Sequence, residues 1–281
     1  MAKENTPTTT ERSNKVLEEG TREDIFGSIK DREIDHVVYD RWQGGARGPE
    51  KIIFKDGRAV IFKCDIRHYW MAQNPDTPIR EAIAYQIDRI IGLGLVPKTV
   101  VIDDTINNVR YDGSIQEWIH DAKDGYAIEK FTPEEKKDFD RLRIFDFVIG
   151  NSDRHLGNVL FTSDGKLHAI DHNASLIISS EDDILSFSDV IVNFLSRNVI
   201  SDMPHVVDII ERLYENKDKI LRLIDTYIQD NKDLAKLMVE SRILYLYKTL
   251  KKDSPFSRKY REWRNGLDAE VREILKRKSN T

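Results

Sequence analysis

The chain has 281 residues, 33% of them charged, and a formal net charge of −5. This length fits one domain of two lobes, and the mixture of both charge signs gives no polybasic reason to expect nucleic acid. The single cysteine, Cys64, excludes an intramolecular disulfide framework and favours a reducing compartment. No apolar run reaches the roughly eighteen residues of a membrane span, and the polar N-terminus lacks a secretory signal. We therefore expect a cytoplasmic protein without a transmembrane segment.

Residues 1–20 are polar, with few apolar side chains to offset the entropy of ordering, and we expect a flexible tail there. Val37 to Trp42 is typical of a strand, which a cluster of three glycines before Pro49 breaks. Backbone amides approach phosphate closely where no Cβ intervenes, so Gly44 and Gly45 are candidate phosphate-binding residues. Such a cluster before a proline is also common in ordinary turns, and this alternative stays open.

The next two β-rich runs, Lys51 to Lys55 and Ala59 to Cys64, are joined by Asp56-Gly57, which predicts a hairpin. Lys63 lies near the end of the second strand. An isolated lysine in such a strand is usually a solvated edge residue. Here its position between the glycine cluster and a helix that bears a suitable acid favours contact with phosphates.

Thr77-Pro78 predicts the start of that helix, as an N-cap followed by a first-turn proline. Isoleucines at helical spacing continue to Ile91, and Gly92 ends the helix. Glu81 lies in the first turns of this helix. It can pair with Lys63, or it can be a surface glutamate of the kind favoured near a helix N-terminus.

Four segments follow the helix before the middle of the chain. Thr99 to Ile102 predicts a strand, Asp103 to Asp112 a polar turn region, and Gly113 to Ile119 a further strand. His120 to Lys130 is a polar linker. The linker divides a β-rich first part of the chain from a second part in which helical patterns dominate.

A capped helix leads into the most informative part of the sequence. Thr132 to Glu135 reads Thr-Pro-Glu-Glu, a capping box with a proline in the first turn. The helix continues with apolar residues to Gly150, where a polar loop begins. This loop contains the run Asp153, Arg154 and His155, and we expect chemistry there.

A second hairpin follows the loop, because Val159 to Phe161 and Leu167 to Ile170 are apolar runs joined by an Asp-Gly turn. The hairpin can hold Asn158 and Asp171 at one end, together with Asp153. Phosphoryl transfer needs one carboxylate to orient the acceptor, and a carboxylate plus an amide oxygen to hold Mg²⁺. Aspartate and asparagine are also common turn residues, but turn formation needs neither the Asp-Arg-His run nor the second aspartate.

The stretch GNSDRHLGNVLF, followed by LHAIDHN, resembles the catalytic and metal-binding segments of the phosphatidylinositol 3/4-kinase-like branch of the protein-kinase-like superfamily. The resemblance covers about residues 45–200. It implies that Asp153 is the catalytic aspartate and that Asn158 and Asp171 bind the metal ion. His155 matches a family residue that either assists proton transfer or positions the loop. His172 and the following asparagine replace the usual Phe-Gly after the metal-binding aspartate, so the usual phenylalanine switch is not expected.

In the first part of the chain the resemblance implies a nucleotide site. Lys63 resembles the lysine of the Val-Ala-Ile-Lys element that contacts the phosphates, and Glu81 matches the acid that pairs with it. Five further positions would lie near the nucleotide by their place in the chain: Gly44, Gly45, Gln116, Glu117 and Trp118. The two glycines would lie at the phosphates, and backbone groups near the last three would bind adenine.

The segment from His172 to Ser196 is the candidate activation and substrate-binding segment, and it contains no Lys or Arg. Phosphoinositide head groups are polyanions that basic side chains normally bind, so this composition argues against a lipid acceptor. From about Pro204 onward the pattern predicts helices, at Val206–Tyr214, Asp218–Ile228 and Leu234–Tyr247. The last part is basic with interleaved Phe256, Tyr260 and Trp263, a composition that suits either RNA contact or a packed terminal helix.

We therefore predict an α+β, two-lobed protein-kinase-like fold: a flexible tail at 1–20, a nucleotide-binding N-lobe at 21–120 and a catalytic, metal-binding C-lobe at 121–281. The leading hypothesis is a kinase, a phosphotransferase with an alcohol group as acceptor, that uses ATP and Mg²⁺ and acts on protein Ser/Thr or a small molecule. The alternatives are an inactive nucleotide-binding module, an AMP transferase, and a structural or nucleic-acid-associated protein that acts through the basic C-terminal part.

Overall fold

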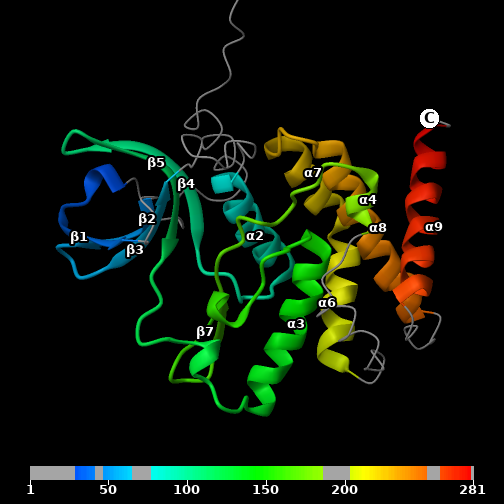
Figure 1. Ribbon diagram of the computed structural model, residues 1–281, viewed down its shortest axis with the longest axis horizontal. Coiled ribbons are helices and arrows are strands. Elements are labelled where there is room, and N and C mark those ends of the chain that lie inside the picture. The colour runs from blue at the N-terminus through cyan, green and yellow to red at the C-terminus, as the bar shows by residue number, and fades with distance from the viewer. Residues whose placement is uncertain (1–28, 42–46, 65–76, 186–202, 252–259, 280–281) are drawn as a thin grey trace, which may run out of the picture.

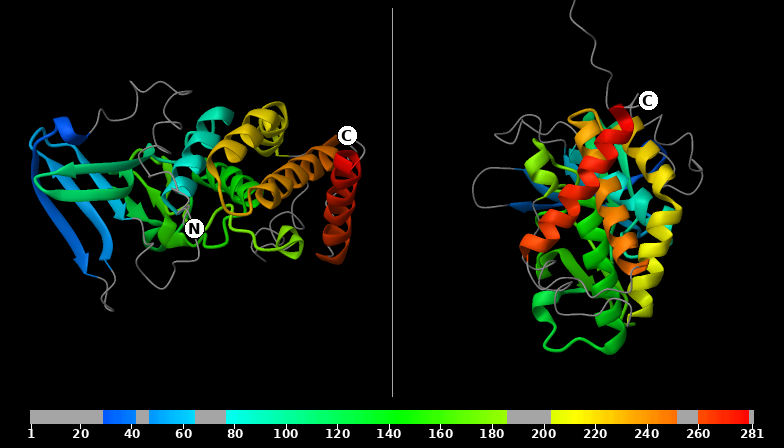
Figure 2. Two further views of the ribbon diagram at one scale, coloured as in Figure 1. Left: turned by 90° about the horizontal axis from the view of Figure 1, so that it is seen from above. Right: turned by 90° about the vertical axis from the view of Figure 1, so that its right-hand side faces the viewer.

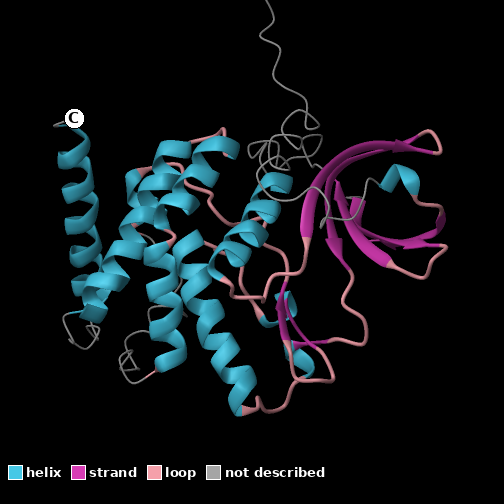
Figure 3. Cartoon of the chain, turned by 180° about the vertical axis from the view of Figure 1, so that it is seen from behind, coloured by secondary structure: helices cyan, strands magenta, loops and turns pink. Residues whose placement is uncertain are grey.

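The computed structural model describes residues 29–41, 47–64, 77–185, 203–251 and 260–279. A five-stranded sheet lies at one end of the molecule and a group of helices at the other, with helix α2 (Thr77–Ile91) beside the sheet (Figure 1). Viewed from behind, the five-stranded sheet lies on one side of the molecule and the long helices on the other (Figure 3). The α+β, two-lobed architecture predicted from the sequence is therefore confirmed.

The five-stranded sheet is antiparallel throughout, with the strand order β1-β2-β3-β5-β4. Its strands are β1 (Ile34–Arg41), β2 (Arg47–Phe54), β3 (Ala59–Cys64), β4 (Thr99–Ile106) and β5 (Val109–Glu117). A single turn, η1 (Ile29–Asp31), precedes β1. One face of the sheet buries a small apolar core that includes Phe54, Phe62 and Ile115. The predicted hairpin at Asp56-Gly57 is confirmed, because β2 and β3 pair directly across it.

Two sequence expectations in this sheet were wrong. Residues 103–112 are not a polar turn region, because β4 and β5 pair from Thr99 to a tight turn at Asn107 and Asn108. Both asparagines have positive φ, 51° and 62°, a conformation that this residue type tolerates better than most. The strand break before residue 50 is also shorter than expected, since β2 already includes Pro49, next to a register irregularity where proline is tolerated.

Helix α2 packs mainly into the larger apolar core, which it shares with the helices of the C-lobe. Its C-terminal end is fixed on two sides. Asp88 accepts hydrogen bonds from three successive amides after the helix, those of residues 94–96, at 2.8 Å each. Arg212 of α6 donates to the carbonyl oxygens of Ile91 and Gly92, at 3.2 and 3.1 Å. The helix that carries Glu81 is thus anchored to the C-lobe, and a lobe boundary after residue 120 stays a prediction.

The remaining elements form the C-lobe. They are β6 (Lys123–Asp124), η3 (Gly125–Ala127), α3 (Pro133–Ile149), η4 (Leu156–Asn158), β7 (Val159–Phe161), β8 (Leu167–Ala169), α4 (Glu181–Ile184), α6 (Pro204–Glu215), α7 (Lys217–Tyr227), α8 (Lys232–Lys251) and α9 (Tyr260–Ser279). The short strands pair in the antiparallel order β6-β7-β8. This small sheet contains the predicted second hairpin. None of the described helices combines the length and the apolar character that crossing a membrane requires.

Helix α3 directly precedes the polar loop. The predicted capping box is confirmed: the Thr132 amide donates to Glu135 Oε2 at 2.7 Å, and the Glu135 amide donates to Thr132 Oγ1 at 3.2 Å. The helix ends at Gly150, which has a positive φ of 67°. A Cβ on Gly150 would lie 2.8 Å from the Met238 side chain, so this end of α3 needs glycine.

The predicted C-terminal helices correspond to α6, α7 and α8. Helix α9 packs on α8 at the end of the molecule opposite the five-stranded sheet (Figure 2), and it buries Leu267, Val271 and Ile274. Lys248 of α8 forms ion pairs with Glu270 and with Glu273, at 2.8 and 3.0 Å. These contacts favour the packed terminal helix over a free RNA-binding segment, while Phe256 and the side chains of Tyr260 and Trp263 lie outside the described residues.

Candidate active site

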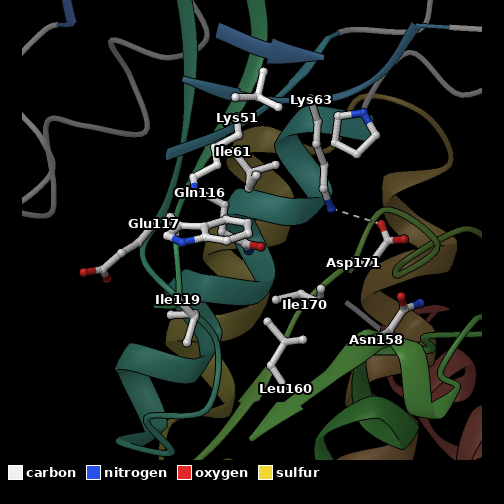
Figure 4. Close-up of a pocket in the computed structure, with 13 residues that line it drawn as sticks. Lys51, Ile61, Lys63, Gln116, Glu117, Ile119, Asn158, Leu160, Ile170 and Asp171 are labelled. Carbon is white, nitrogen blue, oxygen red and sulfur yellow. Dashed lines mark hydrogen bonds and ion pairs between the residues drawn. The ribbon is translucent and has the colours of Figure 1, made fainter. Parts of the chain in front are cut away.

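A cavity of about 480 Å³ lies where the sheet meets the C-lobe. Residues of the sheet and of the segment after β5 line one side, and residues of η4, β7 and the end of β8 line the other (Figure 4). Its walls include four of the predicted site residues with side chains suited to phosphates, metal or base, namely Lys63, Trp118, Asn158 and Asp171. A cavity of this volume is in the usual range for a bound cofactor or drug-sized ligand.

Lys63 lies between two acidic side chains from different parts of the chain. Its Nζ is 2.5 Å from Glu81 Oε1 and 3.1 Å from Asp171 Oδ1, and the second contact is drawn in Figure 4. Burial alone would lower the pKa of Lys63, but the two carboxylates raise it above its usual value. The ammonium is therefore charged and held at the cavity wall, as the resemblance implied for a phosphate-binding lysine.

Glu81 has a second role that the sequence did not indicate. The Glu81 side chain is 1% exposed, and its other oxygen, Oε2, accepts a hydrogen bond from the backbone amide of His172 at 3.2 Å. One carboxylate thus fixes both Lys63 and the residue after Asp171. Asp171 itself has a positive φ of 59°, which turns the chain sharply at the predicted metal-binding position.

Asn158, one of the two predicted metal ligands, is hydrogen-bonded to the polar loop. Its Nδ2 donates to the backbone carbonyl oxygen of Asp153 at 3.0 Å, so its Oδ1 is the atom left to act as a ligand. The Asp153 amide in turn donates to Asn151 Oδ1 at 3.1 Å. The Asp153 side chain is exposed on this loop, where an acceptor molecule can reach it.

The donor set fits Mg²⁺ bound together with phosphates. Asp171 and Asn158 line the same cavity, and each offers a hard oxygen ligand. Within the described residues no group of three or more His, Cys, Asp or Glu side chains could hold a metal ion alone. Magnesium commonly binds through one or two carboxylates plus substrate phosphates, which is the arrangement that this pair of ligands can complete.

Arg154 belongs to the polar run that the sequence singles out, but the sequence assigns it no role. Its guanidinium forms an ion pair with Asp146 at 2.8 Å and donates to the carbonyl oxygens of Asn158 and Ile170, at 2.6 and 2.7 Å. It also donates to His172 Nε2 at 2.9 Å. One side chain therefore joins α3, the polar loop, η4 and the residues on both sides of Asp171.

His172 is buried and neutral. Burial lowers the pKa of its ring well below the ordinary 6.5, and the nearby cations of Arg154 and Lys63 act in the same direction. Because Arg154 can only donate, His172 Nε2 is the acceptor and the proton lies on Nδ1. The described structure shows no hydrogen-bond partner for that buried Nδ1. The ring packs edge-on against Phe145, at 6.0 Å between centroids.

This environment predicts a pH-dependent stability. The unfolded chain binds a proton at the ordinary pKa near 6.5 and the folded chain only well below it, so the free energy of unfolding falls as pH drops below 6.5. Replacing His172 by Gln should make this fall shallower, by up to about 1.4 kcal/mol per pH unit, measured by urea unfolding between pH 7 and 5. The same substitution at the exposed His120 is the control. Equal slopes in wild type and His172→Gln would contradict the assignment.

His155 positions the loop in this structure. Its Nδ1 accepts a hydrogen bond from the Gly157 amide at 3.0 Å and so caps η4. The exposed ring stacks on Tyr126, with centroids 6.3 Å apart. A Cβ on Gly157 would lie 2.9 Å from the His155 ring, so the stacked pair needs glycine at that position. Of the two roles that the resemblance allowed, these contacts are those of a loop-positioning residue.

The three predicted adenine-binding positions differ from one another. Gln116 is buried and donates through Nε2 to Thr99 Oγ1 at 2.8 Å, and the Glu117 side chain points away from the cavity (Figure 4). The amides of Glu117 and Trp118 donate to the carbonyl oxygens of Lys98 and Ala59, at 2.9 and 3.3 Å. Both amides are thus used inside the protein. Ile119 also lines the cavity, and in the described part of the chain its amide makes no backbone hydrogen bond.

Gly44 and Gly45 lie outside the described residues. The first residues after them that face the cavity are Pro49 and Lys51 of β2. The structure therefore brings together Lys63, Glu81 and the two predicted metal ligands, while the predicted phosphate loop stays a sequence-based expectation.

A comparison with protein families assigns most of the chain to one family. The family model described as phosphatidylinositol 3- and 4-kinase matches residues 3–246, which is most of the chain. The chain belongs to this family. The resemblance predicted from the catalytic segment is confirmed, and membership supports phosphotransfer of the kinase type.

A comparison with solved structures finds matches at low identity, among them two proteins described as kinases. One is a proinflammatory kinase of Helicobacter pylori, CtkA, with 16% identity and a TM-score of 0.47, covering 88% of this chain and 98% of that one. The other is the Golgi casein kinase, with 15% identity and a TM-score of 0.46, covering 80% of this chain and 74% of that one. A comparison with curated protein sequences finds no match.

Proposed function

We propose that this protein is a kinase that transfers the γ-phosphoryl group of ATP to a hydroxyl acceptor, with Mg²⁺ as its metal ion. The observation that carries the proposal is the Lys63 ammonium, which lies 2.5 Å from Glu81 and 3.1 Å from Asp171. Asp171 and Asn158 line the same cavity. A phosphate-binding cation and a metal-binding pair therefore face one space of nucleotide size.

In the proposed reaction each residue has one task. Lys63 binds phosphate oxygens while Glu81 keeps the ammonium in place. Asp171 and Asn158 hold Mg²⁺, which neutralises negative charge on the triphosphate. Asp153 orients the acceptor hydroxyl and takes its proton as the hydroxyl oxygen bonds to the γ-phosphorus. The bond from that phosphorus to the bridging oxygen breaks, and ADP leaves with the electron pair.

The adenine contact is assigned to the segment after β5. The amides of Glu117 and Trp118 already donate within the protein, so neither is placed to serve the base. Ile119 lines the cavity next to them. We infer that the Ile119 amide donates to adenine, one residue beyond the positions expected from the sequence.

The acceptor is a protein Ser/Thr side chain or a small hydroxyl compound. The segment that follows Asp171 in the chain contains no Lys or Arg from His172 to Ser196. A phosphoinositide head group carries several negative charges and is normally bound by basic side chains. This composition therefore supports a neutral or basic acceptor, even though the family is described by its lipid kinases.

The direct test is incubation of the purified protein with γ-labelled or α-labelled ATP, a cell extract and a panel of lipids. We expect γ-label on a protein or a small molecule, and no label after EDTA removes the metal. Transfer of α-label would show that AMP is the transferred group. Label that appears only in the lipids would overturn the assigned acceptor class.

The Asp153→Ala variant tests the role of the acceptor-orienting carboxylate. General-base catalysis typically contributes a factor of about 100 or more, so we expect kcat to fall by about that factor while the KM for ATP changes little. Asp233→Ala, at an exposed position in the first turn of α8, is the matched control. If Asp153→Ala retains the labelling rate of wild type, the measured activity is a contaminant and the protein is a binding module.

A further inference from the structure

An unusual pair of side chains lies at the sheet side of the cavity. The Lys51 ammonium lies 3.8 Å from the centroid of the Trp118 ring, well within the range of a cation–π contact. Both residues are half-buried, and both line the cavity. The ammonium therefore occupies space beside the indole that a bound nucleotide would need.

The strand register places Lys51 near the phosphate-binding lysine as well. In the antiparallel pair of β2 and β3, Lys51 is opposite Ile61, so Lys63 is its diagonal neighbour on the same face of the sheet. Figure 4 shows Lys51, Ile61 and Lys63 on the same side of the cavity. Diagonal neighbours are about 7–8 Å apart, a separation that a flexible lysine side chain can span. Lys51 can therefore reach either Trp118 or the phosphate region.

The charges of the site favour movement of Lys51 toward phosphates. Lys63 is held by the carboxylates of Glu81 and Asp171, which largely compensate its charge. Lys51 forms no ion pair with any residue that the structure describes. A nucleoside triphosphate brings about four negative charges into the cavity. Because the Lys51 ammonium has no carboxylate partner among the described residues, it can form ion pairs with the phosphates.

We propose that Lys51 and Trp118 form a nucleotide-responsive pair, in which the base takes the place of the ammonium on the indole and Lys51 turns to bind the phosphates. This proposal rests on the proposed function, because it takes the cavity as an ATP site. Base stacking on an aromatic ring is at least as strong as a cation–π contact at a half-exposed site, so the exchange on Trp118 is favourable or neutral. Trp118 then selects for a base and Lys51 for the triphosphate.

The test compares two probes, adenosine and the non-hydrolysable β,γ-imido analogue of ATP with Mg²⁺, by calorimetry. Lys51→Met removes the charge and keeps an apolar stem, so it should weaken the triphosphate analogue about tenfold and leave adenosine affinity unchanged or higher, because the ammonium no longer competes for the indole. Lys51→Arg should restore the analogue to within about threefold of wild type. Trp118→Ala should weaken both probes by about tenfold, because it removes the stacking surface.

Lys55→Met is the matched control, since Lys55 lies on the same hairpin but forms an exposed ion pair with Glu33. Both of its affinities should equal those of wild type. If Lys51→Met keeps the wild-type ratio of the two affinities, the proposed pair is wrong and the kinase assignment stands. If wild type binds neither probe, the kinase assignment itself is overturned. An unchanged or higher adenosine affinity in Lys51→Met also shows that this variant is folded.

Discussion

Replacing Asp171 by asparagine is expected to lower γ-phosphoryl transfer by about a thousandfold and to leave the fold intact. In the proposed mechanism the Asp171 carboxylate would hold Mg²⁺ against the phosphates, and removing one such preorganised electrostatic group typically costs a factor of about 100 to 1,000 in kcat. Asparagine has nearly the same shape and tolerates the positive φ of 59° at this position. Lys63 keeps its shorter contact, with Glu81 at 2.5 Å, so the ammonium stays in place.

The measurement is kcat/KM with γ-labelled ATP over a range of Mg²⁺ concentrations, together with a thermal unfolding curve for each protein. Asp233→Asn, on an exposed turn of α8 far along the chain, should retain wild-type activity. An Asp171→Asn variant with normal activity and a normal melting temperature would remove the metal-binding role. A variant that unfolds earlier would show that Asp171 is structural instead.

The catalytic segment was predictable because its signals are local. The Thr132 capping box, the glycine at position 150 and the Asp-Gly turn between β7 and β8 each specify their structure within a few residues. The order of these elements then places Asn158 and Asp171 at the same open end of one hairpin. Sequence spacing alone was enough to bring the two predicted metal ligands to one cavity.

The pairing of β4 with β5 was not predictable from periodicity. Between Asp103 and Asp112 only Ile106 and Tyr111 are buried in the N-lobe core, and most of the other residues are charged or polar, so alternation of apolar and polar residues is lost. That end also carries an ion-pair cluster, in which Arg110 binds Asp103 of the neighbouring strand at 2.8 Å and Asp112 of its own strand at 3.2 Å. In sequence, closely spaced charged residues of this kind are also typical of a turn. Periodicity therefore predicts a polar turn region at residues 103–112, where the structure has paired strands.

Contacts to backbone carbonyls and aromatic faces leave no sequence signal at all. Arg154 binds the carbonyl oxygens of Asn158 and Ile170, and any residue type could supply those atoms. The Lys51 contact with Trp118 joins β2 to the segment after β5, 67 positions later in the chain, with no motif between them. The sequence thus indicated the candidate catalytic and metal-binding residues, and the structure was needed to find the residues that hold them in place.

Arg154 gives the largest expected effect on stability. We expect Arg154→Met to lower the free energy of unfolding by about 3–5 kcal/mol, because it leaves the buried Asp146 carboxylate without its cation. Burial already raises the pKa of Asp146, against the effects of Arg154 and of Asn151. The substitution also removes the donor for two carbonyl oxygens and for His172. The measurement is urea unfolding at pH 7, in which the midpoint should fall at an unchanged m-value.

The double variant Arg154→Met, Asp146→Asn separates the ion pair from the carbonyl contacts. Once Asp146 is neutral there is no unpaired buried charge, so the double variant should be more stable than the sum of the two single effects predicts, by about 1–3 kcal/mol. Arg58→Met breaks an exposed pair with Asp56 and should change stability little. A loss below about 1 kcal/mol in Arg154→Met would show that the polar loop does not depend on this residue. Loss of activity in the folded fraction of the variant would show instead that the Arg154 contacts hold Asp171 in its catalytic position.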